Sequence, residues 1–121
     1  VLWSTPGGGD STPAIVDDIL TVQVKSSQLG LVAFKLRPDS VEKLWNFPIE
    51  ATRTQSSPII HQGNVYLMDD KMHYCFSLSS GEVRWKQSSP SAITSPVLVD
   101  GKIYVLTHNG TSITMLKASP E

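Results

Sequence analysis

The chain has 121 residues, of which 40% are apolar and 17% are charged. A chain of this length can bury a core, and this composition excludes a disordered polypeptide. The 10 basic and 11 acidic side chains give a net charge of -1, which excludes a nucleic-acid binder that relies on a basic surface. No apolar run approaches the roughly 20 residues of a membrane-spanning helix, and a single cysteine excludes an internal disulfide framework.

The first elements of the chain are a short apolar strand and a glycine-rich connector. Val1-Leu2-Trp3 is interpreted as the last strand of a preceding structural unit. Gly7-Gly8-Gly9-Asp10 lacks the lysine and the strand–loop–helix context of an anion-binding loop, so we expect a connector there. A first complete unit follows over residues 12–45. Its turn is expected at Asp17-Asp18, which is less favourable than the turns that contain glycine, because neither aspartate adopts positive φ as easily as glycine does.

The remaining chain has almost no apolar periodicity of the helical kind. Short β-branched and aromatic runs alternate with turn residues, and this pattern predicts antiparallel hairpins. A second unit spans residues 57–85, with a tight turn at Gln62-Gly63-Asn64. A third unit spans residues 95–118, with turns at Asp100-Gly101-Lys102 and Asn109-Gly110. Each complete unit divides into four strands, of which the first carries a proline and the last ends in tryptophan. The third unit lacks its last strand.

A repeat of about 40 residues organises these units. Its markers are Pro13, Pro58 and Pro96, which lie 45 and 38 residues apart, and Trp3, Trp45 and Trp85, which lie 42 and 40 residues apart. This period, with about four short strands per unit, is typical of β-propeller blades. We therefore predict an all-β fold of about three blades, each of four antiparallel strands, in one partial β-propeller domain over residues 1–121. The rival fold, a β-sandwich, does not need tryptophan at this period.

The repeat also predicts which residues pack the blades together. An aromatic side chain that recurs once per blade on the outer strand is expected to wedge neighbouring blades rather than to stack on a planar ligand. The predicted blade-packing residues are Trp3, Trp45, Gly81 and Trp85.

The second unit resembles a known repeat. Ser57-Pro58, an apolar pair and a glycine precede Val65-Tyr66, and Ser80-Gly81 is followed four residues later by Trp85. This pattern is similar to the pyrroloquinoline-quinone-like β-propeller repeat of the quinoprotein alcohol-dehydrogenase-like superfamily, and the resemblance covers nearly the whole chain. It implies a parent propeller of about six to eight blades. The resemblance also favours a periplasmic or secreted location.

The family's blade-docking motif is only partly present. Ser77 stands where the family usually has aspartate, and Lys35 and Lys117 take that position in the other two units. Arg37-Pro38-Asp39-Ser40 replaces the usual Thr-Gly turn of the first unit. The packing tryptophan is therefore kept while the acid is lost, which argues against close kinship with the enzymatic branch.

No residue pattern predicts catalysis or metal binding. His61, His73, His108 and Cys75 have no metal-ligand spacing, and Cys75 fills a small-residue position that predicts a buried, inert thiol. Asp69-Asp70 supplies only two carboxylates, too few for a calcium site. We predict no catalytic residue, no metal and no cofactor. Pyrroloquinoline quinone and Ca²⁺ are expected only under the alternative that the chain is part of a quinoprotein dehydrogenase whose cofactor and Ca²⁺ residues lie mostly outside this chain.

The predicted function is that of a non-catalytic scaffold that binds a protein or polysaccharide partner. In a propeller, the loops from strand two to strand three and from strand four to the next strand one share one face, and function usually resides on such loops. The candidate binding residues there are Glu50, Arg53, Asp69, Asp70, His108 and Asn109.

Ring closure predicts a second kind of partner. About three blades cannot close a ring, so we expect contact with the remaining blades of a larger parent chain. The alternative is a second copy, in which residues 1–3 would complete the neighbour's third blade.

Overall fold

The computed structural model describes residues 4, 11–26, 28–49, 56–88 and 95–121 of the chain. Within these residues the backbone forms β-strands and one short 3-10 helix, η1. The strands are β1 (Ala14–Val16), β2 (Ile19–Gln23), β3 (Leu31–Leu36), β4 (Val41–Phe47), β5 (Ile59–His61), β6 (Asn64–Met68), β7 (Met72–Ser77), β8 (Val83–Ser88), β9 (Val97–Val99), β10 (Lys102–Thr107) and β11 (Ser112–Lys117), and η1 is His108–Gly110.

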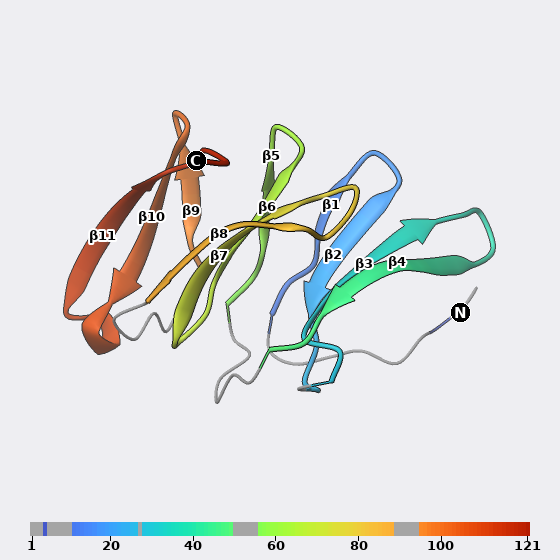
Figure 1. Cartoon of the computed structure of the whole chain (residues 1–121), viewed down its shortest axis with the longest axis horizontal. Coiled ribbons are helices and arrows are strands. Elements are labelled where there is room, and N and C mark those ends of the chain that lie inside the picture. Colours follow the sequence, from blue (N-terminus) through green and yellow to red (C-terminus); the bar gives the residue numbers. More distant parts are fainter. Residues whose placement is uncertain (1–3, 5–10, 27, 50–55, 89–94) are drawn as a thin grey trace.

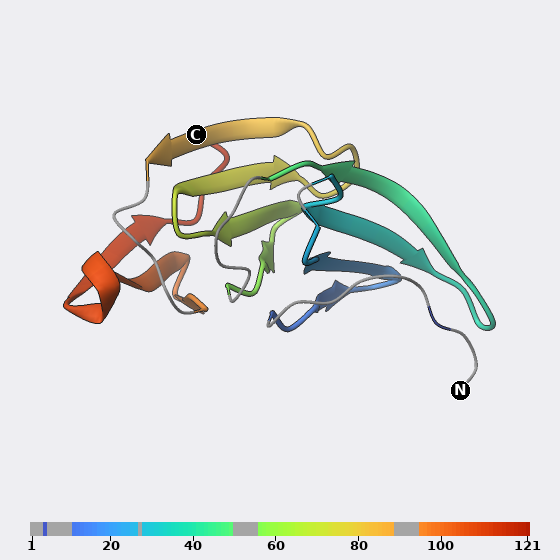
Figure 2. The same ribbon diagram turned by 90° about the horizontal axis from the view of Figure 1, so that it is seen from below.

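The strands pair into three separate antiparallel sheets. Sheet 1 has the order β1-β2-β3-β4, sheet 2 the order β5-β6-β7-β8, and sheet 3 the order β9-β10-β11. The three sheets stand side by side in Figure 1. Seen from below, the short strands β1, β5 and β9 gather on one side of the molecule while β4 and β8 lie on the other (Figure 2). This arrangement confirms the predicted all-β fold and differs from the two packed sheets of a sandwich.

The hairpin turns follow the local chemistry of the sequence. In the turn between β5 and β6, both Gln62 (φ 49°) and Gly63 (φ 78°) adopt positive φ. Asp100 and Gly101 do the same between β9 and β10. Two consecutive residues with positive φ make the turn whose twist matches the twist of paired strands. In the glycine-free turn of sheet 1, Asp17 alone adopts positive φ.

The sequence repeat reappears as an equivalent strand register in all three sheets. The equivalent cross-strand rows are Ala14–Thr21–Ala33–Trp45 in sheet 1, Ile59–Tyr66–Cys75–Trp85 in sheet 2 and Val97–Tyr104–Met115 in sheet 3. The pairing of the third and fourth strands is bulged next to the tryptophan in both four-stranded sheets, between Ala33 and Phe34 and between Cys75 and Phe76. A β-bulge bends and twists a strand locally, so the two outer strands share one shape.

Two apolar clusters hold the sheets face to face. Sheets 1 and 2 share a core that includes Leu31, Leu67 and Phe76, and sheets 2 and 3 share one that includes Tyr66 and Ile103. All five of these side chains are fully buried. Burial of such side chains contributes about 1.5–3 kcal/mol each, which makes these clusters the main source of stability between sheets.

Each tryptophan of an outer strand docks on the sheet that follows it. Trp45 of β4 donates a 2.7 Å hydrogen bond from Nε1 to the carbonyl oxygen of Leu78, just after β7. Trp85 of β8 donates an equivalent 2.7 Å bond to the carbonyl oxygen of Ser119, after β11. Gly81 lies directly against the Trp45 ring, because a Cβ atom at Gly81 would come within 2.5 Å of Trp45 Cδ2.

Two details of the predicted strands and turns are wrong. The outer strands do not end at tryptophan: β4 continues to Phe47 and β8 to Ser88, because their partners Leu31 and Met72 extend the ladders. Asn109-Gly110 does not form a two-residue hairpin turn. The β10–β11 connection contains η1, in which the Thr111 hydroxyl and amide both donate to the carbonyl oxygen of His108.

The Gly81 contact gives a first prediction, with Gly63 as its control. Both glycines have φ near +77° (+76° and +78°), but nothing lies within 4 Å of a Cβ atom at Gly63. Gly63→Ala should therefore cost only the backbone strain, about 1–2 kcal/mol. Gly81→Ala should cost about 1–3 kcal/mol more, because it also displaces the Trp45 ring. Urea unfolding of both variants checks the difference, and equal losses would contradict the docking role of Gly81.

Candidate functional site

The loops that carry the candidate binding residues lie along one edge of the molecule. In Figure 1 the β2–β3, β6–β7 and β10–β11 connections all lie at the lower edge, opposite the β1–β2, β5–β6 and β9–β10 hairpins. Asp69 and Asp70 lie in the β6–β7 connection, residues 69–71, and His108 and Asn109 belong to η1. Glu50, Arg53 and Trp3 lie outside the described residues.

Asp69 holds its own turn together. Its Oδ1 accepts hydrogen bonds from the backbone N–H groups of Lys71 (2.8 Å) and Met72 (2.6 Å). The residue is only 1% exposed. Burial raises the pKa of this carboxyl above its ordinary value, and the two backbone donors oppose that rise. A buried aspartate that accepts two turn amides fixes the β6–β7 loop and leaves little of the carboxylate for a ligand.

His108, which follows β10 in sheet 3, is exposed to solvent, unlike Asp69. It begins η1 with a positive φ of 52° and is exposed, and its Nδ1 lies 3.3 Å from the Thr107 hydroxyl. Within the described part of the chain, no hydrogen bond or ion pair joins His108 to Asp69. The structure thus brings the candidate loops to one edge without joining their side chains in a single site.

His73 and Cys75 share one face of β7 and lie in the core between sheets 2 and 3. His73 contacts Met68 through Nδ1 and is 1% exposed, while Cys75 is fully buried. Burial lowers the pKa of the His73 imidazole and raises the pKa of the Cys75 thiol. Burial also raises the pKa of the Tyr66 hydroxyl, and Cys75 adds to that rise. Each shift favours the neutral form, which suits packing and does not suit an activated nucleophile.

The residues before the repeated prolines make a polar contact that the sequence did not suggest. Thr12 donates its backbone N–H to the Ser57 hydroxyl (2.7 Å), and Ser57 donates its own N–H to the Ser95 hydroxyl (3.0 Å). We call this chain of bonds the hydroxyl belt. It links the starts of the three sheets. The signal that could have predicted it is the Thr-Pro or Ser-Pro pair at the head of every unit.

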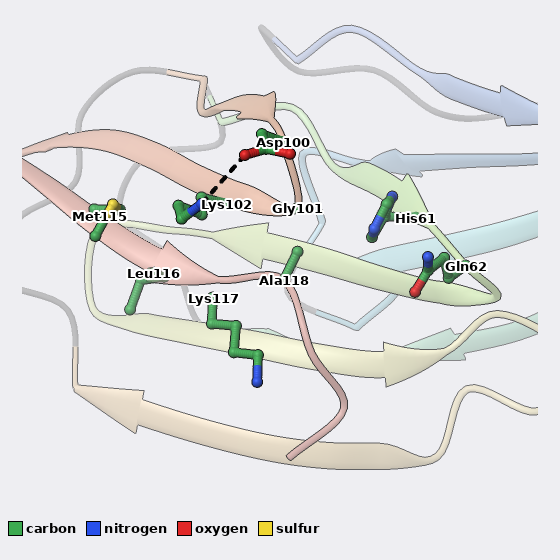
Figure 3. A pocket seen from close by; sticks show the side chains of 9 residues that line it. All are labelled: His61, Gln62, Asp100, Gly101, Lys102, Met115, Leu116, Lys117 and Ala118. Carbon is green, nitrogen blue, oxygen red and sulfur yellow. Dashed lines mark hydrogen bonds and ion pairs between the residues drawn. The ribbon is translucent and has the colours of Figure 1, made fainter.

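A cavity lies at the hairpin edge, away from the candidate loops. It has a volume of about 440 Å³ and lies between the hairpin turns of sheets 2 and 3 and the end of β11 (Figure 3). Its lining residues are His61, Gln62, Asp100, Gly101, Lys102, Met115, Leu116, Lys117 and Ala118. Asp100 and Lys102 form a 3.5 Å ion pair there. No local sequence pattern indicates this cavity, because its walls come from two sheets that meet only in the folded chain.

The described residues do not fit the Ca²⁺ of the alternative function. A calcium site needs six to eight oxygen ligands, and Asp69, the buried carboxylate of the loop edge, is already bonded to two amides. In the part of the chain that the structure describes, no group of three or more His, Cys, Asp or Glu side chains could hold a metal ion. Nor is any helix among these residues long and apolar enough to cross a membrane.

The buried histidine gives a prediction about pH. Because its folded-state pKa lies below the ordinary value of 6.5, the unfolded chain takes up a proton below pH 6.5 that the folded chain resists. The contribution of His73 to stability is therefore complete above that pH and is lost as the pH falls. His73→Phe should flatten the dependence of the free energy of unfolding on pH between 7.5 and 5.5, measured by urea unfolding. A steep slope that persists in the His73 variant would contradict the assignment.

Three comparisons place this architecture among known proteins. The family described as outer membrane protein assembly factor BamB matches residues 2–119. A search of curated proteins finds no match. Among solved structures, BamB from Moraxella catarrhalis matches with a TM-score of 0.69 and 15% identity, over 97% of this chain and 36% of that one.

Two dehydrogenases share the fold. Quinohemoprotein alcohol dehydrogenase from Comamonas testosteroni matches with a TM-score of 0.62 and 18% identity, over 82% of this chain and 17% of that one. Quinohemoprotein alcohol dehydrogenase ADHIIG from Pseudomonas putida HK5 matches with a TM-score of 0.69 and 15% identity, over 96% of this chain and 20% of that one. The chain thus spans little more than a third, or less, of these structures, and such low identities show a common fold alone. The structure and the family match together confirm the predicted resemblance to the quinoprotein-like repeat: the three sheets are β-propeller blades, and the chain belongs to the family of outer membrane protein assembly factor BamB.

Proposed function

We propose that the chain is a non-catalytic scaffold whose loop edge binds a protein partner. One observation carries the proposal: the side chains that could act as an acid, a base or a nucleophile are hydrogen-bonded or buried within the fold. Asp69 is bonded to the amides of its own turn, and His73 and Cys75 are buried in neutral form between two sheets. Side chains held in this way stabilise the blades. The candidate contacts at the loop edge are Asp70 and the exposed His108.

The family match supports this assignment and suggests a compartment. The family's description names a factor that assembles outer membrane proteins, which is a task of binding other polypeptides. On this basis we propose that the chain works on the periplasmic side of an outer membrane. Because the chain spans about a third of the BamB structure that it matches, the activity of the whole protein belongs to the same proposal.

The competing proposal is that the chain is part of a quinoprotein dehydrogenase, a class of enzyme whose fold two of the similar structures share. Most of the residues that hold the quinone and Ca²⁺ of such an enzyme would lie outside this chain. The scaffold is the better supported proposal because the family match over residues 2–119 is to an assembly factor.

Site-specific photo-crosslinking tests the scaffold proposal. A photoreactive residue is placed at Asp70 or His108, and a third variant carries it at Asp39, which is exposed in the β3–β4 turn away from the loop edge. In cells that make the protein, the two loop-edge variants should form adducts with polypeptides and the Asp39 variant should not. Adducts that are equal at all three positions, or absent from the loop edge, would contradict the proposal.

A second measurement addresses the competing function. Pyrroloquinoline quinone and Ca²⁺ are added to the protein, and the reduction of a dye is followed with alcohols as substrates. We expect no reduction above the rate of the cofactor alone. Substrate-dependent dye reduction would overturn the scaffold proposal.

A further inference from the structure

Two polar side chains of β2 are buried between sheets 1 and 2. Thr21 and Gln23 are only 0% and 1% exposed. They lie on one face of the strand, opposite Ala33 and Leu31 of β3, and both of these partners belong to the apolar cluster that sheets 1 and 2 share. The side chains of Thr21 and Gln23 therefore point toward sheet 2. Both sheets contain all four of their strands, so complete blades bound this space on its two sides.

Sheet 1 differs at these two positions from the sheet that follows it. The residues equivalent to Thr21 and Gln23 in the strand register are Tyr66 and Met68. Tyr66 and Met68 are fully buried and belong to the cluster between sheets 2 and 3. A hydroxyl and an amide thus stand where the next blade packs an aromatic ring and a thioether. Burial of such polar groups costs free energy unless each of them has a hydrogen-bond partner.

None of the buried polar oxygens here has that partner within the described residues. Thr21 Oγ1 and Gln23 Oε1 are buried and have no hydrogen-bond partner. A third oxygen in the same condition is Oγ of Ser56, a residue that is 4% exposed. A hydroxyl can donate as well as accept, so any two of these oxygens at bonding distance would have satisfied each other. The three oxygens therefore do not bond one another directly.

Two hydrogen bonds hold Ser56 close to the end of β2. The Ser11 hydroxyl donates to the backbone carbonyl oxygen of Gln23 (2.9 Å). The next residue, Thr12, donates its N–H to the hydroxyl of Ser57 (2.7 Å). Ser56 directly precedes Ser57 in the chain. This short path joins the end of β2 to the segment that leads into β5, so the Ser56 oxygen approaches Gln23 from the side of sheet 2.

We infer that an ordered water molecule is bound between sheets 1 and 2 by Thr21, Gln23 and Ser56. Gln23 Oε1 can only accept, so it takes one hydrogen of the water. One hydroxyl takes the second hydrogen and the other hydroxyl donates to the water oxygen. Three hydrogen bonds to otherwise unsatisfied groups are usual for a buried water. Three neutral oxygens are too few for a cation such as Ca²⁺, which needs six to eight ligands.

The bound water links the two sheets. It joins the end of β2 to the segment before β5, beside the hydroxyl belt, and it satisfies oxygens whose burial would otherwise oppose the packing of sheet 1 on sheet 2. The inference concerns how these two blades are held together. It does not depend on the proposed scaffold function, and the crosslinking results at the loop edge do not bear on it.

A double-mutant cycle tests the inference. Thr21→Val and Gln23→Met each remove one partner of the water, and urea unfolding of the whole chain measures the equilibrium constant for unfolding. Each single change should raise this constant about fivefold, the usual effect of one lost hydrogen bond. The double variant should raise it by less than about tenfold instead of the product of about 25-fold, because both groups bond the same water. Single changes that lower the constant, or effects that multiply, would overturn the inference.

Thr114→Val in sheet 3 is the matched control. The Thr114 hydroxyl is bonded to the Thr107 hydroxyl (2.8 Å), so this variant also loses one hydrogen bond. Combined with Gln23→Met, its effect should multiply, because the two residues lie in different sheets and share no partner. A departure from the product as large as that of the Thr21 pair would show a general effect of the substitution and would overturn the inference.

Nuclear magnetic resonance locates the water directly. Magnetisation transfer from water should reach the Thr21 methyl group and the Gln23 side-chain amide, although both residues are closed to bulk solvent. The transfer should be lost in the double variant at neighbouring Ala33. Absence of transfer to Thr21 and Gln23 in the unchanged chain would overturn the inference. So would a stability that differs between NaCl and KCl at equal ionic strength, because it would assign the site to a monovalent cation.

Discussion

The docking of each outer-strand tryptophan on the next sheet is the interaction on which the architecture depends. Trp45 joins sheet 1 to sheet 2 and Trp85 joins sheet 2 to sheet 3, each through an indole N–H bonded to a backbone carbonyl. An indole that is buried without a partner for its N–H would be costly, so the bond fixes where the ring can lie. Gly81 completes the contact around Trp45, since any side chain there would meet the ring.

This interaction at the outer strands has a counterpart at the inner strands. The hydroxyl belt joins Thr12 to Ser57 and Ser57 to Ser95, so each sheet is tied to the next at both of its ends. Apolar clusters fill the space between the tryptophan hydrogen bonds and the hydroxyl belt. The tryptophans and the belt set the register of one sheet against the next, while burial of apolar surface supplies most of the stabilisation.

The same construction explains which groups are left for function. Polar side chains within the blades serve the fold, as Asp69 does in its turn and His73 does beside Met68. The candidate binding groups lie at the loop edge, where His108 is exposed. A scaffold that binds polypeptides can use such loops, because the blades hold the loops in place while their side chains make the contacts.

The sequence by itself determined the fold class. Alternating apolar strands, glycine turns and a tryptophan period near 40 residues all follow from local rules, because strand pairing and turn conformation depend on near neighbours in the chain. It also indicated that Cys75 is buried and that the blade-docking tryptophan is kept. The same local reasoning missed the lengths of β4 and β8, since the end of a strand depends on how far its partner extends.

Only the tertiary structure decided what lies between the sheets. The hydroxyl belt joins residues 45 and 38 positions apart, and the cavity of Figure 3 has walls from two sheets. Of the candidate binding residues, the sequence indicated the loops that carry Asp69 and His108. The fold decided that Asp69 is buried and bonded to amides while His108 is exposed. The physical reason is that burial and hydrogen bonding depend on how sheets pack, which no local pattern of residues encodes.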